Sequence, residues 1–180
     1  MLSVRIPQDR IGVLIGTHGS TKAEIEKISG LKLDVDSETG EVTIDGVNTS
    51  DPEMPLKVRE VVRAIGRGFS PKKAYRLFDS GVYLEIIDLK DFVGKNSKRM
   101  KTVRARLIGT NGKTRRIIEE LSEAEVSIYG NTVAIIGDYL QLDISRNSIM
   151  MILNGNQHGT VYKYLERRRK DVHLSRLDSI

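Results

Sequence analysis

The sequence predicts an α+β protein built from two copies of one module, each with a three-stranded sheet packed against helices. Residues 14–30, LIGTHGSTKAEIEKISG, align without a gap on residues 107–123, LIGTNGKTRRIIEELSE. In both places the matched segment is followed by two short stretches of alternating apolar residues, as in a hairpin. Such a repeat indicates a duplicated structural unit, and 180 residues provide two units of ordinary domain size.

The elements of the first copy follow from the spacing of its apolar residues. Ile25 and Ile28 are three positions apart and indicate one face of a helix that ends at Gly30. The next stretch alternates as a strand and returns after a polar turn. In order, we expect a strand at 4–6, a helical turn at 11–15, a helix capped by Ser20 or Thr21, strands at 31–36 and 41–45, and helices at 57–65 and 71–78.

The second copy repeats the same order, a strand, two helices joined by a turn, two strands and closing helices. A weaker match between residues 64–78 and 151–165 supports this order and places the boundary near residue 80. We therefore predict a first domain at 1–79 and a second at 80–180. The second domain is expected to contain a strand at 82–89, helices at 98–108 and 114–121, a hairpin at 126–137, and helices at 139–153 and 159–170.

Composition excludes several classes of site. The chain has no cysteine, which removes disulfide frameworks, cysteine nucleophiles and thiolate metal sites. Its three histidines are too scattered to build a metal site. No apolar run approaches the ~18 residues of a membrane span, and no signal peptide is recognisable. We expect a cytoplasmic protein that does not contact a membrane.

No acid–base or nucleophile constellation is recognisable, so we predict a protein that is not an enzyme and has no cofactor or metal. The string GTNGKT at 109–114 is similar to the end of a phosphate-binding P-loop. That motif requires a glycine where this chain has Leu107, which argues against an ATPase.

The two glycine turns are the strongest candidates for a binding site. Two glycines three positions apart allow the backbone to turn sharply and to approach a ligand without an intervening Cβ. The amides that begin the next helix are unpaired donors at the positive end of the helix dipole, which favours phosphate. We expect the first turn at 16–19 and the second turn at 109–112 to suit a phosphate group.

Order, spacing and apolar positions together resemble the K-homology (KH) signature, an I-G-x-x-G turn between two helices followed by a hairpin. The resemblance covers both copies and implies two type I KH domains, each of topology β-α-α-β-β-α. It also implies that each turn clamps the backbone of single-stranded RNA. The residues that would contact RNA are Gly16, Thr17, His18, Gly19 and Lys22 in the first copy, and Arg104, Arg106, Gly109, Thr110, Asn111, Gly112, Lys113, Arg115 and Arg116 in the second.

Charge favours the second copy as the main RNA contact. Residues 1–98 hold 15 basic and 15 acidic side chains, whereas residues 99–180 hold 14 and 9 and carry the whole net charge of +5. Cations such as Lys113 and Arg115 at the start of a helix oppose its dipole, and a bound anion would remove that conflict. Near the first turn the acidic residues Glu24 and Glu26 offset Lys22.

The segments 67–78, 130–138 and 158–170 extend the resemblance to the Krr/Pno (Dim-type) family of two-KH proteins of small-subunit ribosome assembly, in its archaeal form. This resemblance implies an assembly factor at the 3′ region of small-subunit rRNA. It also implies partnership with the Nob-type endonuclease and with other assembly or translation factors. The sequence leaves open whether the first module binds RNA or protein.

An alternative is a protein-interaction adaptor that recruits a nuclease or translation factor and contacts RNA only weakly. Such an adaptor would not need Arg104, Arg106, Lys113, Arg115 and Arg116 to gather around one turn. The RNA sequence, the oligomeric state and the surface that a partner covers do not follow from the sequence.

Overall fold

The computed structural model describes residues 1–46 and 49–178, and the chain divides into two compact units, Met1–Ser80 and Gly81–Ile180. We call them the first and second modules. Each contains a three-stranded antiparallel sheet with helices packed on it, which confirms the predicted fold class. Within each sheet the third strand in sequence is central, with the order β1-β3-β2 in the first module and β4-β6-β5 in the second.

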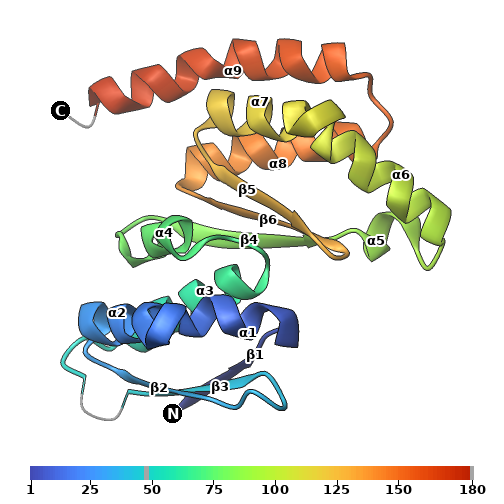
Figure 1. Ribbon diagram of the computed structural model, residues 1–180. Coiled ribbons are helices and arrows are strands. Elements are labelled where there is room, and N and C mark those ends of the chain that lie inside the picture. The colour runs from blue at the N-terminus through green and yellow to red at the C-terminus, as the bar shows by residue number, and fades with distance from the viewer. Residues whose placement is uncertain (47–48, 179–180) are drawn as a thin grey trace. The chain divides into compact units, whose positions relative to one another are not determined.

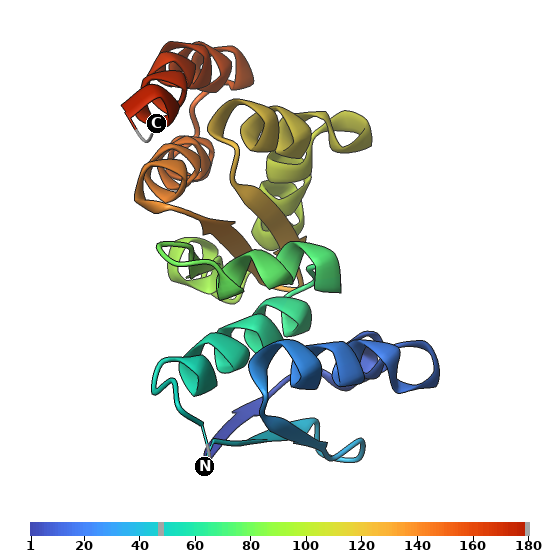
Figure 2. The ribbon, with the colours of Figure 1, turned by 90° about the vertical axis from the view of Figure 1, so that its left-hand side faces the viewer.

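In the first module the three main helices lie on one face of the sheet (Figures 1 and 2). The central strand directs Val42 and Ile44 into the core, where both are fully buried with Leu14 and Ile25. The elements are β1 (Leu2–Arg5), α1 (Gln8–Ile15), η1 (Thr17–Gly19), α2 (Ser20–Ser29), β2 (Lys32–Val35), β3 (Glu41–Asp45), α3 (Met54–Gly66), α4 (Pro71–Ala74) and η2 (Tyr75–Phe78).

The second module repeats this plan and adds a long final helix. α9 packs on α7 and α8, on the side away from the sheet (Figure 1). Its buried residues Val161, Leu165 and Val172 join the core that Ile118 and Ile135 occupy. The elements are β4 (Tyr83–Asp88), α5 (Lys90–Val93), α6 (Ser97–Ile108), η3 (Thr110–Gly112), α7 (Lys113–Ser122), β5 (Glu125–Tyr129), β6 (Thr132–Gly137), α8 (Tyr139–Leu153) and α9 (His158–Asp178).

Several element boundaries differ from the sequence-based expectations. α3 begins at Met54 rather than residue 57, because Pro55 stands in its first turn, where proline's fixed φ suits a helix. α9 continues to Asp178 rather than residue 170, because Val172 packs into the core and sustains the helix beyond that point. The short helix α5 was not expected.

Two local expectations for α2 were wrong. Gly19 occupies the N-cap position and no side chain caps the helix, so neither Ser20 nor Thr21 has that role. Ile25 is fully buried, but Ile28 is exposed. The apolar face of α2 is therefore narrower than the spacing suggested.

Candidate nucleic-acid interface

The two turns have nearly identical backbones. Gly16, His18 and Gly19 have φ values of 78°, 53° and 75°, and the corresponding residues of the second turn have 76°, 54° and 75°. Each turn therefore contains three residues in the left-handed region, one of which is not glycine. His18 and Asn111 hold that position, and asparagine adopts this conformation more readily than most residues.

The first glycine of each turn is required by packing as well as by conformation. A Cβ on Gly109 would lie 2.3 Å from Oγ1 of Thr114, and one on Gly16 would lie 2.4 Å from Oγ1 of Thr21. The turn thus presses against the start of the helix that follows it. A Cβ on Gly112 would meet nothing closer than 3.8 Å, so that glycine is required by its φ value alone.

A tyrosine near the end of each module holds the helix that follows the turn. In the second module the hydroxyls of Thr114 and Tyr162 are 2.9 Å apart, which joins α7 to α9. In the first, the hydroxyl of Tyr75 donates to Oε2 of Glu24 on α2 at 3.3 Å. These two tyrosines are equivalent in the internal repeat, but their hydrogen-bond partners differ.

A glutamate in the same helix fixes the neighbouring edge strand. Oε2 of Glu119 accepts a hydrogen bond from the amide of Val126 at 3.0 Å, and Oε2 of Glu26 accepts one from Leu33 at 3.4 Å. Because β5 and β2 are edge strands, these bonds set their positions against the helix that begins at the turn. In each module this hydrogen bond ties the edge strand to the helix that follows the turn.

Of the five cations predicted around the second turn, two are free to meet a ligand. Lys113 and Arg116 are exposed and make no ion pair or side-chain hydrogen bond with any residue that the structure describes. Arg115 is paired with Glu119 on its own helix. Arg104 is half-buried, and its Nε is buried without a hydrogen-bond partner among the described residues.

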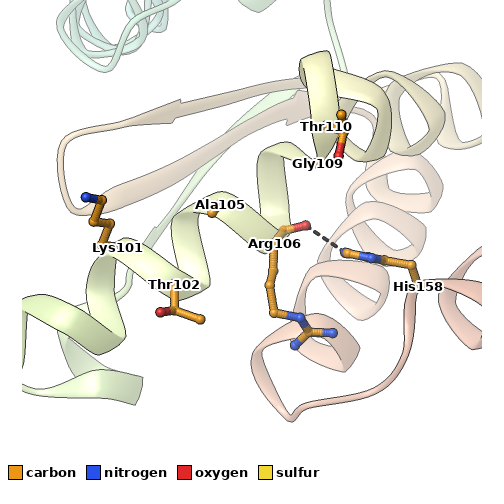
Figure 3. Close-up of a pocket in the computed structure, with 7 residues that line it drawn as sticks. All are labelled: Lys101, Thr102, Ala105, Arg106, Gly109, Thr110 and His158. Atoms are coloured by element: carbon orange, nitrogen blue, oxygen red, sulfur yellow. Dashed lines mark hydrogen bonds between the residues drawn. The ribbon is translucent and has the colours of Figure 1, made fainter.

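Arg106 lies close to the second turn, and its guanidinium is engaged in hydrogen bonds within the second module. Its guanidinium donates to the carbonyl oxygens of Ile152, at 2.8 Å, and Asn156. Its own carbonyl oxygen lies 2.9 Å from Nε2 of His158 at the start of α9 (Figure 3). Arg106 therefore holds the connection between α8 and α9 to α6.

An arginine that the sequence analysis did not select does the same in the first module. Arg10 on α1 donates to the carbonyl oxygens of Ile65, at 2.8 Å, and Phe69, at 2.9 Å. Both arginines lie on the helix before the turn and bind the end of the closing helix. Arg10 stands at a different position in the repeat from Arg106, so the alignment could not reveal the shared role.

The first turn carries less available positive charge. Thr17 and His18 are exposed at its tip. Nζ of Lys22 lies 3.8 Å from a carboxylate oxygen of Glu26, and Glu24 is exposed on the same helix. The exposed cations therefore favour the second turn.

Clustered metal-ligating side chains and long apolar helices are both absent from the described part of the chain. No group of three or more metal-ligating side chains gathers among residues 1–46 and 49–178. Within those same ranges, no helix is both long and apolar enough to cross a membrane.

Comparison with known proteins agrees with the observed fold. The profile described as "Eukaryotic type KH-domain (KH-domain type I)" matches residues 83–170, and the "KH domain" profile matches residues 1–57. The fold and the paired turns therefore define a tandem KH protein of RNA-binding type.

Individual relatives identify the family. The KH domain-containing protein MJ0443 of Methanocaldococcus jannaschii is 43% identical over 97% of this chain and 77% of its own length. The crystal structure of Dim2p from Pyrococcus horikoshii is 52% identical, covers 92% of this chain and 98% of its own, and has a TM-score of 0.86. A chain of the a/eIF2alpha–aDim2p–rRNA complex from the same organism is 53% identical over 94% of each chain, with a TM-score of 0.88. This chain belongs to the Dim2p family of two-KH proteins.

Proposed function

We propose that the protein is a non-catalytic ribosome assembly factor that binds single-stranded RNA in the 3′ region of small-subunit rRNA. The observation that carries the proposal is the second turn. There, the exposed residues Lys113 and Arg116 lie in the first turn of α7, directly after Gly112. Backbone amides at a helix N-terminus favour phosphate. The exposed side chains of Lys113 and Arg116 add positive charge that can neutralise a phosphate.

The comparisons support an RNA ligand of this kind. The Pyrococcus horikoshii relative was solved with rRNA and a/eIF2alpha. We infer that this chain also binds rRNA and contacts the corresponding translation factor. By the family resemblance, we propose the Nob-type endonuclease as a further partner.

A protein-binding role is a second candidate for the first module. Its turn has the same backbone as the second turn, but Lys22 is paired with Glu26, and Glu24 places a negative charge on the same helix. Negative charge beside the turn repels phosphate and is compatible with a basic protein surface. This feature favours a division in which the second module binds RNA and the first binds a protein.

Paired variants that insert negative charge into each turn test the proposal. Replacing Thr110 and Asn111 by aspartates places two carboxylates where phosphate would lie, and both positions are exposed. We expect this variant to lose at least tenfold in affinity for a single-stranded rRNA 3′ fragment, because the two carboxylates would repel the phosphate that the unaltered turn contacts. The matched control replaces Thr17 and His18 by aspartates in the first turn and should lose much less.

Binding is measured by fluorescence anisotropy, with circular dichroism to confirm that both variants fold. A duplex of the same sequence serves as a second probe and should bind poorly, since KH domains accept unstacked single strands. Equal losses in both variants would contradict the assignment to the second module. Preference for the duplex would contradict the KH mode of binding.

A further inference from the structure

An open pocket of about 440 Å³ lies beside the second turn, within the second module (Figure 3). One wall is the outward face of α6, with Lys101, Thr102 and Ala105. The other side is formed by Thr110 of the turn and by His158, the first residue of α9. Its volume is within the ~300–1,000 Å³ range typical of small-ligand sites.

The pocket's chemistry suits a nucleotide. Lys101 is exposed and has no ion pair or side-chain hydrogen bond to any residue that the structure describes. The hydroxyl of Thr110 adds a hydrogen-bonding group, and that of Thr102, which donates to the carbonyl oxygen of Lys98, can still accept one. Ala105 and the ring of His158 add apolar surface. The lining residues include no carboxylate. A phosphate can meet the cation and a base can lie on the apolar surface.

The far wall of the pocket is held in place before any ligand arrives. Nε2 of His158 donates to the carbonyl oxygen of Arg106 at 2.9 Å. The guanidinium of Arg106 binds the connection that leads into α9. The His158 ring also lies nearly parallel to that of Tyr162, at an interplanar angle of 14°. These side chains are therefore ordered in the folded protein, so ligand binding loses little additional conformational entropy there.

The pocket adjoins the second turn, so it would receive a nucleotide next to those that the turn contacts. It shares Gly109 and Thr110 with the second turn, so a strand held there passes its rim. Its lining residues come from α6, the turn and α9, and none comes from the edge strand β5. It is therefore separate from the surface between α7 and β5.

We propose that this pocket binds the RNA nucleotide that flanks the segment clamped by the second turn, and so extends the RNA site by one nucleotide. The proposal rests on the RNA-binding function proposed above. Lys101 would contact the phosphate, and the base would stack on the His158 ring. Because a stacked base contributes about 1–3 kcal/mol, we expect the flanking nucleotide to raise affinity roughly tenfold.

A truncation series of RNA tests this inference. Fragments of the 3′-terminal small-subunit rRNA are shortened one nucleotide at a time from each end, and affinity for the full chain is measured by anisotropy. We expect the removal of one terminal nucleotide to produce a roughly tenfold loss. In the Lys101→Glu and Ala105→Glu variants, that step should disappear while affinity for the shorter RNA is kept to within about twofold.

The matched control is Lys98→Glu, which makes the same charge change on an exposed residue of α6 outside the pocket. This control should retain the tenfold step. Equal effects of Lys98→Glu and Lys101→Glu, or the same step in Ala105→Glu as in the unaltered protein, would overturn the pocket proposal while leaving the turn as the RNA site. Failure of the unaltered protein to bind any fragment would overturn the proposed function itself.

Discussion

Gly109 and Gly112 both have a positive φ, but the structure requires them for different reasons. At Gly109 the space for a Cβ is already filled by Oγ1 and the amide nitrogen of Thr114. At Gly112 that space is open. The sequence motif shows the two glycines as equivalent, whereas the packing shows that one is structural and the other leaves room for a ligand.

Alanine variants of these glycines should separate the two roles. Gly112→Ala should destabilise the second module by about 1–2 kcal/mol, the usual cost of a left-handed conformation for a residue with a Cβ. Gly109→Ala should cost clearly more, because φ 76° with ψ 171° is a conformation that residues with a Cβ rarely adopt, and because the added Cβ would clash with Thr114. Denaturant unfolding followed by circular dichroism measures both. Equal losses of stability would contradict the packing role of Gly109.

Arg106 has hydrogen-bond partners that the sequence did not reveal. Its position beside the turn in a basic segment is typical of a phosphate contact. Its distance from the carbonyls of Ile152 and Asn156 depends on how α8 ends and α9 begins, which charge patterning does not reveal. Lys113 and Arg116, by contrast, were selected from the sequence and are exposed in the structure.

At the scale of elements, the two modules share the same order of helices and strands, but some of the hydrogen bonds between these elements differ. Both modules keep the glutamate that binds the edge strand and the tyrosine that holds the helix after the turn. The tyrosine's partner is a glutamate in the first module and a buried threonine in the second. Because of this difference, the hydrogen bond between Tyr75 and Glu24 in the first module is sensitive to pH.

The stability of the first module should fall in alkali through Tyr75. Partial burial of the phenol, together with the charge of Glu24, raises the pKa of Tyr75 to about 12, from an ordinary value of about 10. Because the folded state holds the proton more tightly, this contribution to stability is complete below about pH 10 and is lost as the pH rises towards 12.

The Tyr75→Phe variant isolates this effect from the titration of lysines. Its free energy of unfolding should decline less steeply between pH 10 and 12 than that of the unaltered protein, as measured by urea unfolding at a series of pH values. The Tyr162→Phe variant is the control in the second module, where the partner of the tyrosine carries no charge. Parallel curves for Tyr75→Phe and the unaltered protein would refute the tie between Tyr75 and Glu24.

Much of the order of helices and strands could be predicted, because it depends on the spacing of apolar residues along short segments of the chain. Helix α8 begins and ends at the residues expected from its apolar run, and the hairpin at 126–137 follows from alternation and a glycine turn. The pocket beside Thr110 could not be predicted. It requires His158 to return to α6 from about fifty residues further along the chain, and such long-range contacts leave no periodic signal.

At the scale of the whole molecule, charge distinguishes two modules of the same fold. The turns share one backbone geometry, yet the net charge of +5 lies entirely in residues 99–180. The internal repeat predicted the shared frame, and the charge count predicted the difference. Which cations remain free for a ligand became clear only from the ion pairs, because Arg115 and Lys22 are both paired with a glutamate one helical turn away.

The salt dependence of RNA affinity tests the central claim most directly, that Lys113 and Arg116 at the second turn contact RNA phosphates. For single strands, each phosphate contact that is removed lowers the slope of log K against log salt by about 0.7. Replacing both residues by alanine should therefore reduce the slope by about 1.4 and weaken all single-stranded sequences alike. The control replaces Lys90 and Lys95, two exposed cations of the same module, and should leave the slope unchanged. An unchanged slope and affinity in the Lys113 and Arg116 variant would contradict the account.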